Sequence, residues 1–141
     1  MDAFDADVLI YAAVPGHPLG RRVAALFTAG PRRKSDPPDG VGSLLLLPEV
    51  LGKPLRDRAV DEVRILSALL ARLELRPLDR ATAELATALC GSYRLRAADA
   101  AHLATAIAVG ADRFITDNQR DFPTTITEIQ VVYPSDLPDA T

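Results

Sequence analysis

The sequence predicts an α/β protein in which a parallel sheet is flanked by helices on both faces, an α/β/α sandwich. Short segments rich in β-branched and aromatic residues alternate with segments whose apolar residues recur every three to four positions. Most connections between these segments are short and carry Gly, Pro or Asp at their ends. Strands that alternate with helices favour parallel pairing, because each crossover helix returns the chain to the same edge of the sheet.

The composition is that of one globular domain, residues 1–141. An apolar share of 48% and a charged share of 25% are ordinary, and 141 residues are enough to bury a core. No run of about 18 apolar residues occurs, so we expect no membrane-spanning helix. Asp2, Asp5 and Asp7 stand where a secretory signal is basic, which makes the cytoplasm the expected location. Cys90 is the only cysteine, which excludes an internal disulfide and a Cys-rich zinc site.

The first element is ambiguous. Residues 8–11 are strand formers by propensity. Asp5 or Asp7 could instead cap a helix that runs to Ala13, and of the two we expect Asp7 to be the cap. Both interpretations stay open at this point.

A helix, a long loop and a short strand follow. We predict a helix over residues 21–29 that ends at a Gly-Pro pair. Residues 30–42 form a loop rich in Pro, Gly and charge, and loops of this length are usually mobile or functional. A short strand from Val41 leads into a Leu-rich helical turn that Gly52 and Pro54 end.

The second half of the chain has clearer signals. The clearest helix is predicted over residues 57–73, where apolar residues form a stripe at helical spacing. Asp79 is the expected N-cap of a helix that continues to Cys90, where Gly91 ends it. The other predicted elements are an extended segment over residues 75–78, a helix over residues 98–109 with Gly110 as its C-cap, and strands over residues 113–116 and 129–133.

Four carboxylates lie where a strand is expected to meet a helix or a loop: Asp5, Glu49, Asp99 and Asp117. In an open α/β sheet such positions converge at the carboxyl ends of the strands, where ligands bind. Crowded carboxylates repel one another without a cation, so the cluster predicts a hard divalent metal. A metal held by carboxylates and water is a common device for cleaving phosphodiesters, which favours a metal-dependent nuclease.

Each acid also has a purely structural interpretation. Asp5 could simply cap a helix, and Glu49 or Asp99 could be a first-turn acid that gains from the helix dipole. Asp99, however, shares a helix face with His102 and Leu103, a face that otherwise packs inward. A charge there is costly unless it is paired or metal-bound, which favours the site interpretation.

Four segments resemble the motifs of PIN-domain ribonucleases. Residues 4–12 look like the opening motif, residues 46–51 like the second, residues 99–106 like the third and residues 110–122 like the last. Their order and spacing are similar to those of the small VapC-like toxins of bacterial toxin–antitoxin pairs, and the resemblance spans nearly the whole chain. It implies a single PIN-like domain, Mg²⁺- or Mn²⁺-dependent endoribonuclease activity, dimerisation and a cognate antitoxin that blocks the site.

The hypothesis that follows gives each acid a role. Asp5 and Asp99 bind the first ion, Glu49 supports it directly or through water, and Asp117 supports a second ion. The last motif departs from the family pattern, because Asn118 fills the usual acidic place while Asp117 precedes it. Secondary candidates are Asp7, where the family usually has Asn or Ser, Thr116, whose hydroxyl could bind phosphate or orient a ligand, Asn118 and Asp121.

Basic and imidazole side chains complete the candidate set. We expect His102 to be packed and bonded to backbone or a carboxylate, and His17 to lie exposed in a turn, so neither is proposed as a general base. The net charge of −3 is not that of a protein that coats nucleic acid, so RNA contacts must be local. The candidates are Arg32, Arg33 and Lys34, which form either a solvated loop or an RNA-gripping flap, together with Arg94, Arg96 and Arg120 near the motifs.

Two other classes stay open. Residues 4–8 also read as the nucleophile motif of a haloacid-dehalogenase-like phosphohydrolase, but that chemistry needs a positioned lysine, and only Lys34 and Lys53 are present. The second alternative is a catalytically inactive PIN-like scaffold that only binds a partner.

The partner prediction rests on the acidity of the site. An antitoxin is expected to place an Arg or Lys near Asp5, Glu49 and Asp99, because Arg pairs bidentately with carboxylates. The apolar helices within residues 19–27 and 44–73 would supply the hydrophobic part of that contact or of a homodimer.

Overall fold

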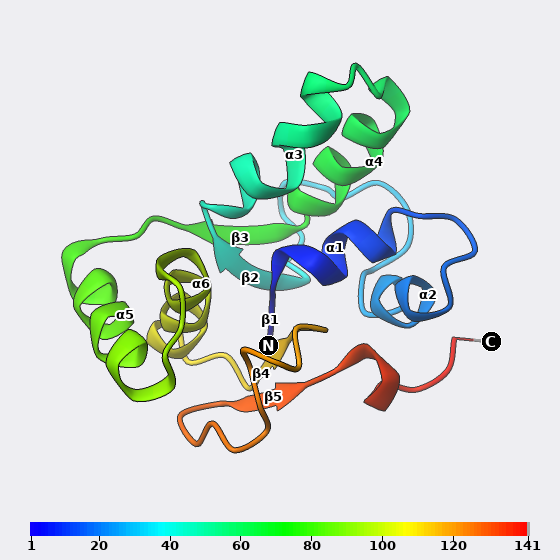
Figure 1. The fold of residues 1–141 in the computed structure, drawn as a ribbon. Helices are drawn as coiled ribbons and strands as arrows, with labels where there is room; N and C mark the ends of the chain where they lie inside the picture. Colours follow the sequence, from blue (N-terminus) through cyan, green and yellow to red (C-terminus); the bar gives the residue numbers. More distant parts are fainter. Residues whose placement is uncertain (141) are drawn as a thin grey trace.

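A five-stranded sheet forms the centre of the protein (Figure 1), which the computed structural model describes over residues 1–140. The strands are β1 (Asp2–Phe4), β2 (Gly40–Ser43), β3 (Leu73–Arg76), β4 (Arg113–Ile115) and β5 (Gln130–Val132). Their order is β3-β2-β1-β4-β5, and every neighbouring pair is parallel, which confirms the predicted sheet. The chain order reverses between β1 and β4, so the crevice at their carboxyl ends is the expected ligand site of this topology.

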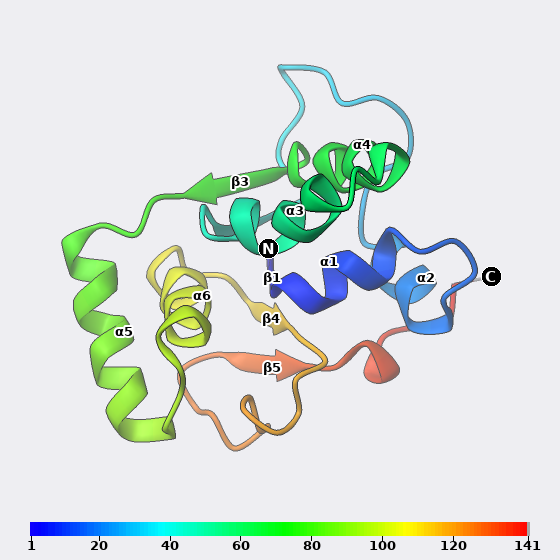
Figure 2. The same cartoon turned by 45° about the horizontal axis from the view of Figure 1, so that its top comes forward.

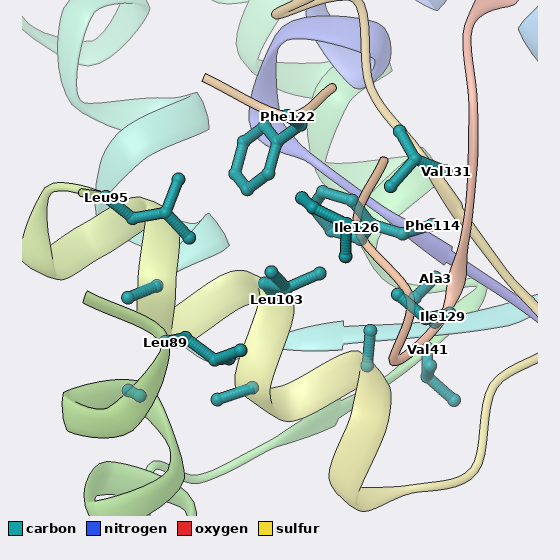
Figure 3. Close-up of a cluster of buried hydrophobic side chains, with 14 residues drawn as sticks. Ala3, Val41, Leu89, Leu95, Leu103, Phe114, Phe122, Ile126, Ile129 and Val131 are labelled. Atoms are coloured by element: carbon teal, nitrogen blue, oxygen red, sulfur yellow. The ribbon is translucent and has the colours of Figure 1, made fainter. Parts of the chain in front are cut away.

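Helices cover both faces of the sheet (Figures 1 and 2). The helices are α1 (Ala6–Ala12), α2 (Pro18–Ala24), α3 (Leu46–Arg56), α4 (Val60–Leu70), α5 (Arg80–Tyr93), α6 (Ala97–Ala108) and a 3₁₀ turn, η1 (Pro134–Asp136). Alternate strand residues face opposite sides: Phe114 packs with α5 and α6, and Ile115 with the α1–α4 layer. Figure 3 shows the first of these two cores, where Leu95, Leu103 and Phe122 lie beside the sheet residues.

The ambiguous first element is a helix, so the strand interpretation of residues 8–11 is wrong. Val8 and Leu9 are fully buried, and burying this helical face against the sheet outweighs their β-propensity. The cap is Asp5 and not Asp7: its backbone is extended (φ −81°, ψ 163°) and its carboxylate accepts from the N–H of Ala6. The sequence predicts no residue range for the preceding strand β1, because three residues carry no periodicity.

Two helices continue past the glycines and the proline that were expected to end them. α3 runs through Gly52 and Pro54 to Arg56, since Pro54 removes only one hydrogen bond near the helix end and its ring is buried. α5 runs past Gly91 to Tyr93, and its C-cap is Arg94 in the left-handed conformation (φ 56°). The predicted N-cap Asp79 is confirmed by a 2.8 Å hydrogen bond from the N–H of Thr82.

Other boundaries differ from the prediction. α4 covers only Val60–Leu70, because residues 71–72 lead directly into β3. Of its predicted apolar stripe, Leu66 and Leu70 are buried, whereas Val60 is 75% exposed. α2 begins at Pro18, earlier than predicted, because His17 caps it, and it ends at Ala24. The helix before Gly110 is confirmed as α6, and Gly110 has the positive φ (72°) expected of a helix-ending glycine.

The long loop is tied to the amino ends of two strands. Asp39 accepts hydrogen bonds from the N–H and the hydroxyl of Thr28 and forms an ion pair with Arg72 at 3.5 Å. Arg32 donates to the carbonyl of Ala71 at 2.9 Å. Because residue 39 precedes β2 and residue 72 precedes β3, the loop (light blue in Figure 2) belongs to the amino end of the parallel sheet.

None of the helices within residues 1–140 combines the length and the apolar character that crossing a membrane requires.

Candidate active site

Two neighbouring strands bring the first site residues together at the carboxyl end of the sheet. Asp5 directly follows β1, and Thr116 directly follows β4, so parallel pairing places them side by side. The N–H of Asp5 donates to the carbonyl of Ile115 at 2.9 Å. The hydroxyl of Thr116 donates to Oδ2 of Asp5 at 2.8 Å, and both side chains are buried. The site therefore begins at the topological reversal point of the sheet.

Asp5 is a buried acid in a polar setting. Its exposed fraction is 5%, and its Oδ1 accepts from the N–H of Ala6 at 2.8 Å. Burial raises its pKa, and the neighbouring Glu49 raises it further, whereas His102 and the hydrogen bonds from Thr116 and Ala6 lower it. A carboxylate in this position gains from any cation that enters the site.

Asp99 lies in the first turn of α6 and faces the same acids. Its pKa is raised first by burial, next by Asp5 and Asp121, and also by Glu49, while His102 lowers it. Three separate elements thus direct carboxylates toward one place: Asp5 is the N-cap of α1, and Glu49 and Asp99 lie in the first turns of α3 and α6.

His102 contacts one of these acids. Its side chain is 1% exposed, and its Nε2 lies 3.0 Å from Oε2 of Glu49, whose side chain is 34% exposed. This confirms the prediction of a packed histidine bonded to a carboxylate, although the sequence did not identify the partner. Among residues 1–140, the Nδ1 atom of this ring is the buried side-chain nitrogen or oxygen without a hydrogen-bond partner.

Asp117 lies on a different side of the site from Asp99. The hydroxyl of Tyr11 donates to its Oδ2 at 3.1 Å, and its N–H donates to Oδ2 of Asp7 at 3.0 Å. Burial, followed by the charge of Asp5, raises the pKa of Asp7 to about 7. Sequence reasoning missed Tyr11; the available signal was its position four residues after Asp7, on the same helix face.

Asp121, a secondary candidate, is the acid of the last motif whose charge acts on Asp99. Asn118 turns toward it, and its Nδ2 donates to Oδ2 of Asp121 at 3.0 Å. The N–H of Asn118 donates to Oγ1 of Thr116 at 3.1 Å, which closes the turn after β4. The last motif therefore splits into Asp117 beside Asp7 and Asp121 beside Asp99.

The donor set suits a hard divalent cation. Within residues 1–140, no three or more His, Cys, Asp or Glu side chains are gathered closely enough to form a complete metal site by themselves. Mg²⁺ needs no such cage, because it usually takes one or two carboxylates and completes its shell with water and substrate phosphate. Asp5 and Asp99, whose pKa values are both raised in part by the charge of Glu49, fit that requirement together with Glu49.

The basic candidates divide between the two ends of the sheet. Arg94 and Arg96 are exposed on either side of the buried Leu95, directly before Asp99 in α6. Arg120 is exposed beside Asp121. The structure does not bring Arg32, Arg33 and Lys34 to the acids, because their loop is tied to the amino end of the sheet.

His17 is not the exposed turn residue that the sequence suggested. It is partly buried as the N-cap of α2, and its Nδ1 accepts from the N–H of Gly20 at 3.0 Å. Its ring stacks on Tyr11 with centroids 4.5 Å apart. The reason is the close approach of α1 and α2 at Gly20, where a Cβ atom would lie 2.0 Å from the carbonyl oxygen of Tyr11.

Comparison with known proteins agrees with this geometry. The PIN domain family model matches residues 3–125. A solved structure described as a toxin–antitoxin complex from Klebsiella pneumoniae is similar to the chain, with a TM-score of 0.71 and 27% identity. That match covers 95% of this chain and 98% of the other. No curated protein matches the chain. Because the family model spans most of the sequence, the chain belongs to the PIN domain family, whose members are generally nucleases.

Proposed function

We propose that this protein is a metal-dependent endoribonuclease and the toxin of a toxin–antitoxin pair. The observation that carries the proposal is the buried carboxylate of Asp5, which meets the acids Glu49 and Asp99 at the carboxyl end of a PIN-domain sheet. Three acids from three different elements would be mutually repulsive without a cation, so their convergence is better explained by a site than by stability.

Asp5 and Asp99 would hold a Mg²⁺ or Mn²⁺ ion, with Glu49 as a direct or water-mediated ligand. Asp117 and Asp121 are the candidates to support a second ion. When bound, the metal would supply an activated water and neutralise charge on the scissile phosphate.

The other side chains would act by orienting the acids. The buried hydroxyl of Thr116 holds Oδ2 of Asp5 and leaves that carboxylate with one orientation. Neither histidine is placed as a general base, because His17 caps α2 through Nδ1 and His102 contacts Glu49 through Nε2. Proton removal in this proposal therefore needs no imidazole.

The RNA would be held by arginines on the rim of the site. Arg94, Arg96 and Arg120 are exposed, and none of them forms an ion pair with another residue in the range 1–140. Their guanidinium groups suit phosphate oxygens, and single-stranded RNA is the form of RNA whose backbone and bases are both accessible to such side chains.

The proposed inhibitor is a small antitoxin. The similar Klebsiella structure is a toxin–antitoxin complex, and an anionic site is a suitable receptor for an Arg of such a partner. A groove of about 240 Å³ between α3, α4 and β3 is lined by Leu47, Leu51, Leu70 and Leu75, among others, and could take apolar side chains of the antitoxin or of a second copy in a homodimer.

A second candidate, an inactive PIN-like scaffold, is compatible with the same acids, since a protein that only binds a partner needs no complete metal site within residues 1–140. The haloacid-dehalogenase alternative has no comparable support. It needs a lysine at the acids, whereas Lys34 and Lys53 are both exposed and Lys34 belongs to the loop at the amino end of the sheet.

The test combines metal binding with RNA cleavage. The wild-type protein should bind Mn²⁺ in a calorimetric titration and cleave a single-stranded RNA only when the metal is present. Asp99→Asn should remove cleavage while the circular dichroism spectrum and the melting temperature stay close to those of the wild type. Metal binding without any RNA cleavage, or no Mn²⁺ binding at all, would favour the scaffold. Expression of the protein alone should slow growth, and co-expression of a small protein encoded by a neighbouring gene should restore it.

A further inference from the structure

We infer that His102 is a positioning residue of the proposed nuclease, and that it holds the carboxylate of Glu49 in the site. The inference rests on the proposed function, because Glu49 matters to the reaction only if the acids bind a metal. It assigns to His102 neither proton transfer nor contact with substrate.

The geometry of the pair is asymmetric. His102 lies on the inner face of α6, where its side chain is 1% exposed, whereas the side chain of Glu49 is 34% exposed and has three rotatable bonds. The 3.0 Å contact between Nε2 and Oε2 links a fixed ring to a flexible chain. A flexible acid at the mouth of a site is held in one rotamer only if a rigid neighbour bonds it, which is the role of residues behind a metal ligand.

The tautomer follows from this contact. An oxygen of an ionised carboxylate can only accept, so beside an ionised Glu49 the hydrogen of this contact is on Nε2. The other oxygen of Glu49 has no hydrogen-bond partner within residues 1–140, which leaves it available to a metal or a metal-associated water.

The second nitrogen argues against a purely stabilising role for the ring. Nδ1 is buried without a partner among the residues that the structure describes, an arrangement that is unfavourable for folding. On α6, Ala101, Leu103 and Ala106 are apolar and buried around His102, while Asp99 lies on the same face one turn earlier. An apolar side chain of similar size would satisfy this packing better, so the contact with Glu49 is the feature that explains an imidazole at residue 102.

Replacement of the His102 ring separates its role in holding Glu49 from its role in the packing of α6. His102→Leu removes the donor, and His102→Gln keeps a donor at a similar distance from the backbone. We expect His102→Leu to fold with an unchanged or higher melting temperature and to bind Mn²⁺ about 10–100-fold more weakly, the usual effect of losing a residue that orients a metal ligand. His102→Gln should recover part of that loss.

Two controls make the result specific. Thr105→Val changes another buried polar group of α6, whose hydroxyl bonds only to the carbonyl of Ala101 at 2.8 Å, and should leave Mn²⁺ affinity unchanged. In the background of Glu49→Ala, His102→Leu should cause no further loss of affinity, because a residue that acts through Glu49 has nothing left to hold.

A metal-free readout is also available, because the chain has only two histidines. In ¹⁵N NMR spectra recorded with EDTA, His102 should have its hydrogen on Nε2, and Glu49→Ala should shift the His102 signals but not those of His17. Equal Mn²⁺ affinity of His102→Leu and wild type, or full additivity with Glu49→Ala, overturns the inference and leaves the proposed function intact. A wild-type protein that neither binds Mn²⁺ nor cleaves RNA overturns the proposed function, and this inference with it.

Discussion

The hydroxyl of Tyr11 donates a hydrogen bond to Oδ2 of Asp117 at 3.1 Å, which joins helix α1 to the turn after β4. The same tyrosine stacks on His17, so the contact between α1 and α2 also determines where the Asp117 carboxylate points. The orientation of this acid therefore depends on Tyr11, which belongs to the first of the four motifs, and through it on His17, which lies outside them.

Removal of that hydroxyl tests whether Asp117 takes part in the reaction. Tyr11→Phe keeps the ring and its stacking, and the loss of one hydrogen bond should lower the free energy of unfolding by about 1 kcal/mol. If Asp117 supports an ion, the Mn²⁺ concentration that gives half-maximal cleavage should rise. Tyr93→Phe, which removes a hydroxyl bonded to Glu128 at the surface, is the matched control. An unchanged metal requirement would show that this hydroxyl does not position Asp117 for the reaction.

The two acids of the last motif should differ in importance. We expect Asp121→Asn to raise the Mn²⁺ requirement for cleavage more than Asp117→Asn, because the charge of Asp121 acts on Asp99 whereas Asp117 is bonded to Tyr11 and Asp7. Metal titrations of RNA cleavage by both variants measure the difference. The opposite order would place the second ion on the Asp7 side of the site.

Asp7 should make the stability of the metal-free protein depend on pH. Its pKa is about 7 in the folded state, mainly because of burial and next because of Asp5, and about 3.9 in an unfolded chain. The folded state therefore binds the proton of Asp7 more tightly than the unfolded state does. The stability that this proton contributes is complete below about pH 4 and is lost as the pH rises to about 7. Asp7→Asn removes the titration.

The free energies of unfolding of Asp7→Asn and wild type, measured in EDTA from pH 4 to pH 8, should diverge as the pH rises. The variant should be the more stable protein at pH 8, by at most about 4 kcal/mol, since each unit of pKa difference corresponds to about 1.4 kcal/mol. A difference that does not change with pH would show that Asp7 is ionised throughout this range.

Thr116 should matter through its hydroxyl. Thr116→Val leaves Oδ2 of the buried Asp5 without its donor, which should cost about 1–3 kcal/mol of stability and weaken Mn²⁺ binding. Thr116→Ser keeps the hydroxyl and should stay close to the wild type in both respects. Equal behaviour of the valine and serine variants in chemical denaturation and metal titration would contradict the role assigned to the hydroxyl.

The position of the arginines predicts which of them bind RNA. Arg94→Ala combined with Arg96→Ala should weaken binding to single-stranded RNA and reduce the slope of log K against log salt by about 1.4, since each phosphate contact contributes about 0.7. Arg32→Ala combined with Arg33→Ala is the charge-matched control at the amino end of the sheet and should leave the slope unchanged. Fluorescence anisotropy at several salt concentrations, with EDTA to prevent cleavage, measures both pairs. A larger effect of the control pair would indicate that the long loop, residues 30–42, binds RNA.

The fold class and the three central acids could be predicted from the sequence because both depend on local patterns. Alternating strand and helix signals predict a parallel sheet, and a parallel sheet brings the residues after its strands to one edge. This reasoning predicts that Asp5, Glu49 and Asp99 lie at that edge. Helix ends at Gly52, Pro54 and Gly91 were predicted wrongly, because buried side chains nearby outweigh the local preference of a glycine or a proline.

The tertiary structure alone decided which side chains meet. His102 contacts Glu49 across 53 residues of chain, and Tyr11 contacts Asp117 across 106 residues, so no periodicity or spacing relates the partners. The same holds for the last motif, where a turn after β4 places Asp117 and Asp121 on different sides of the site. Local composition determines the elements and the edge at which they end, but the rotation of each helix and the path of each turn depend on packing against distant residues. The helix rotations and turn paths in turn determine which side chain each acid contacts.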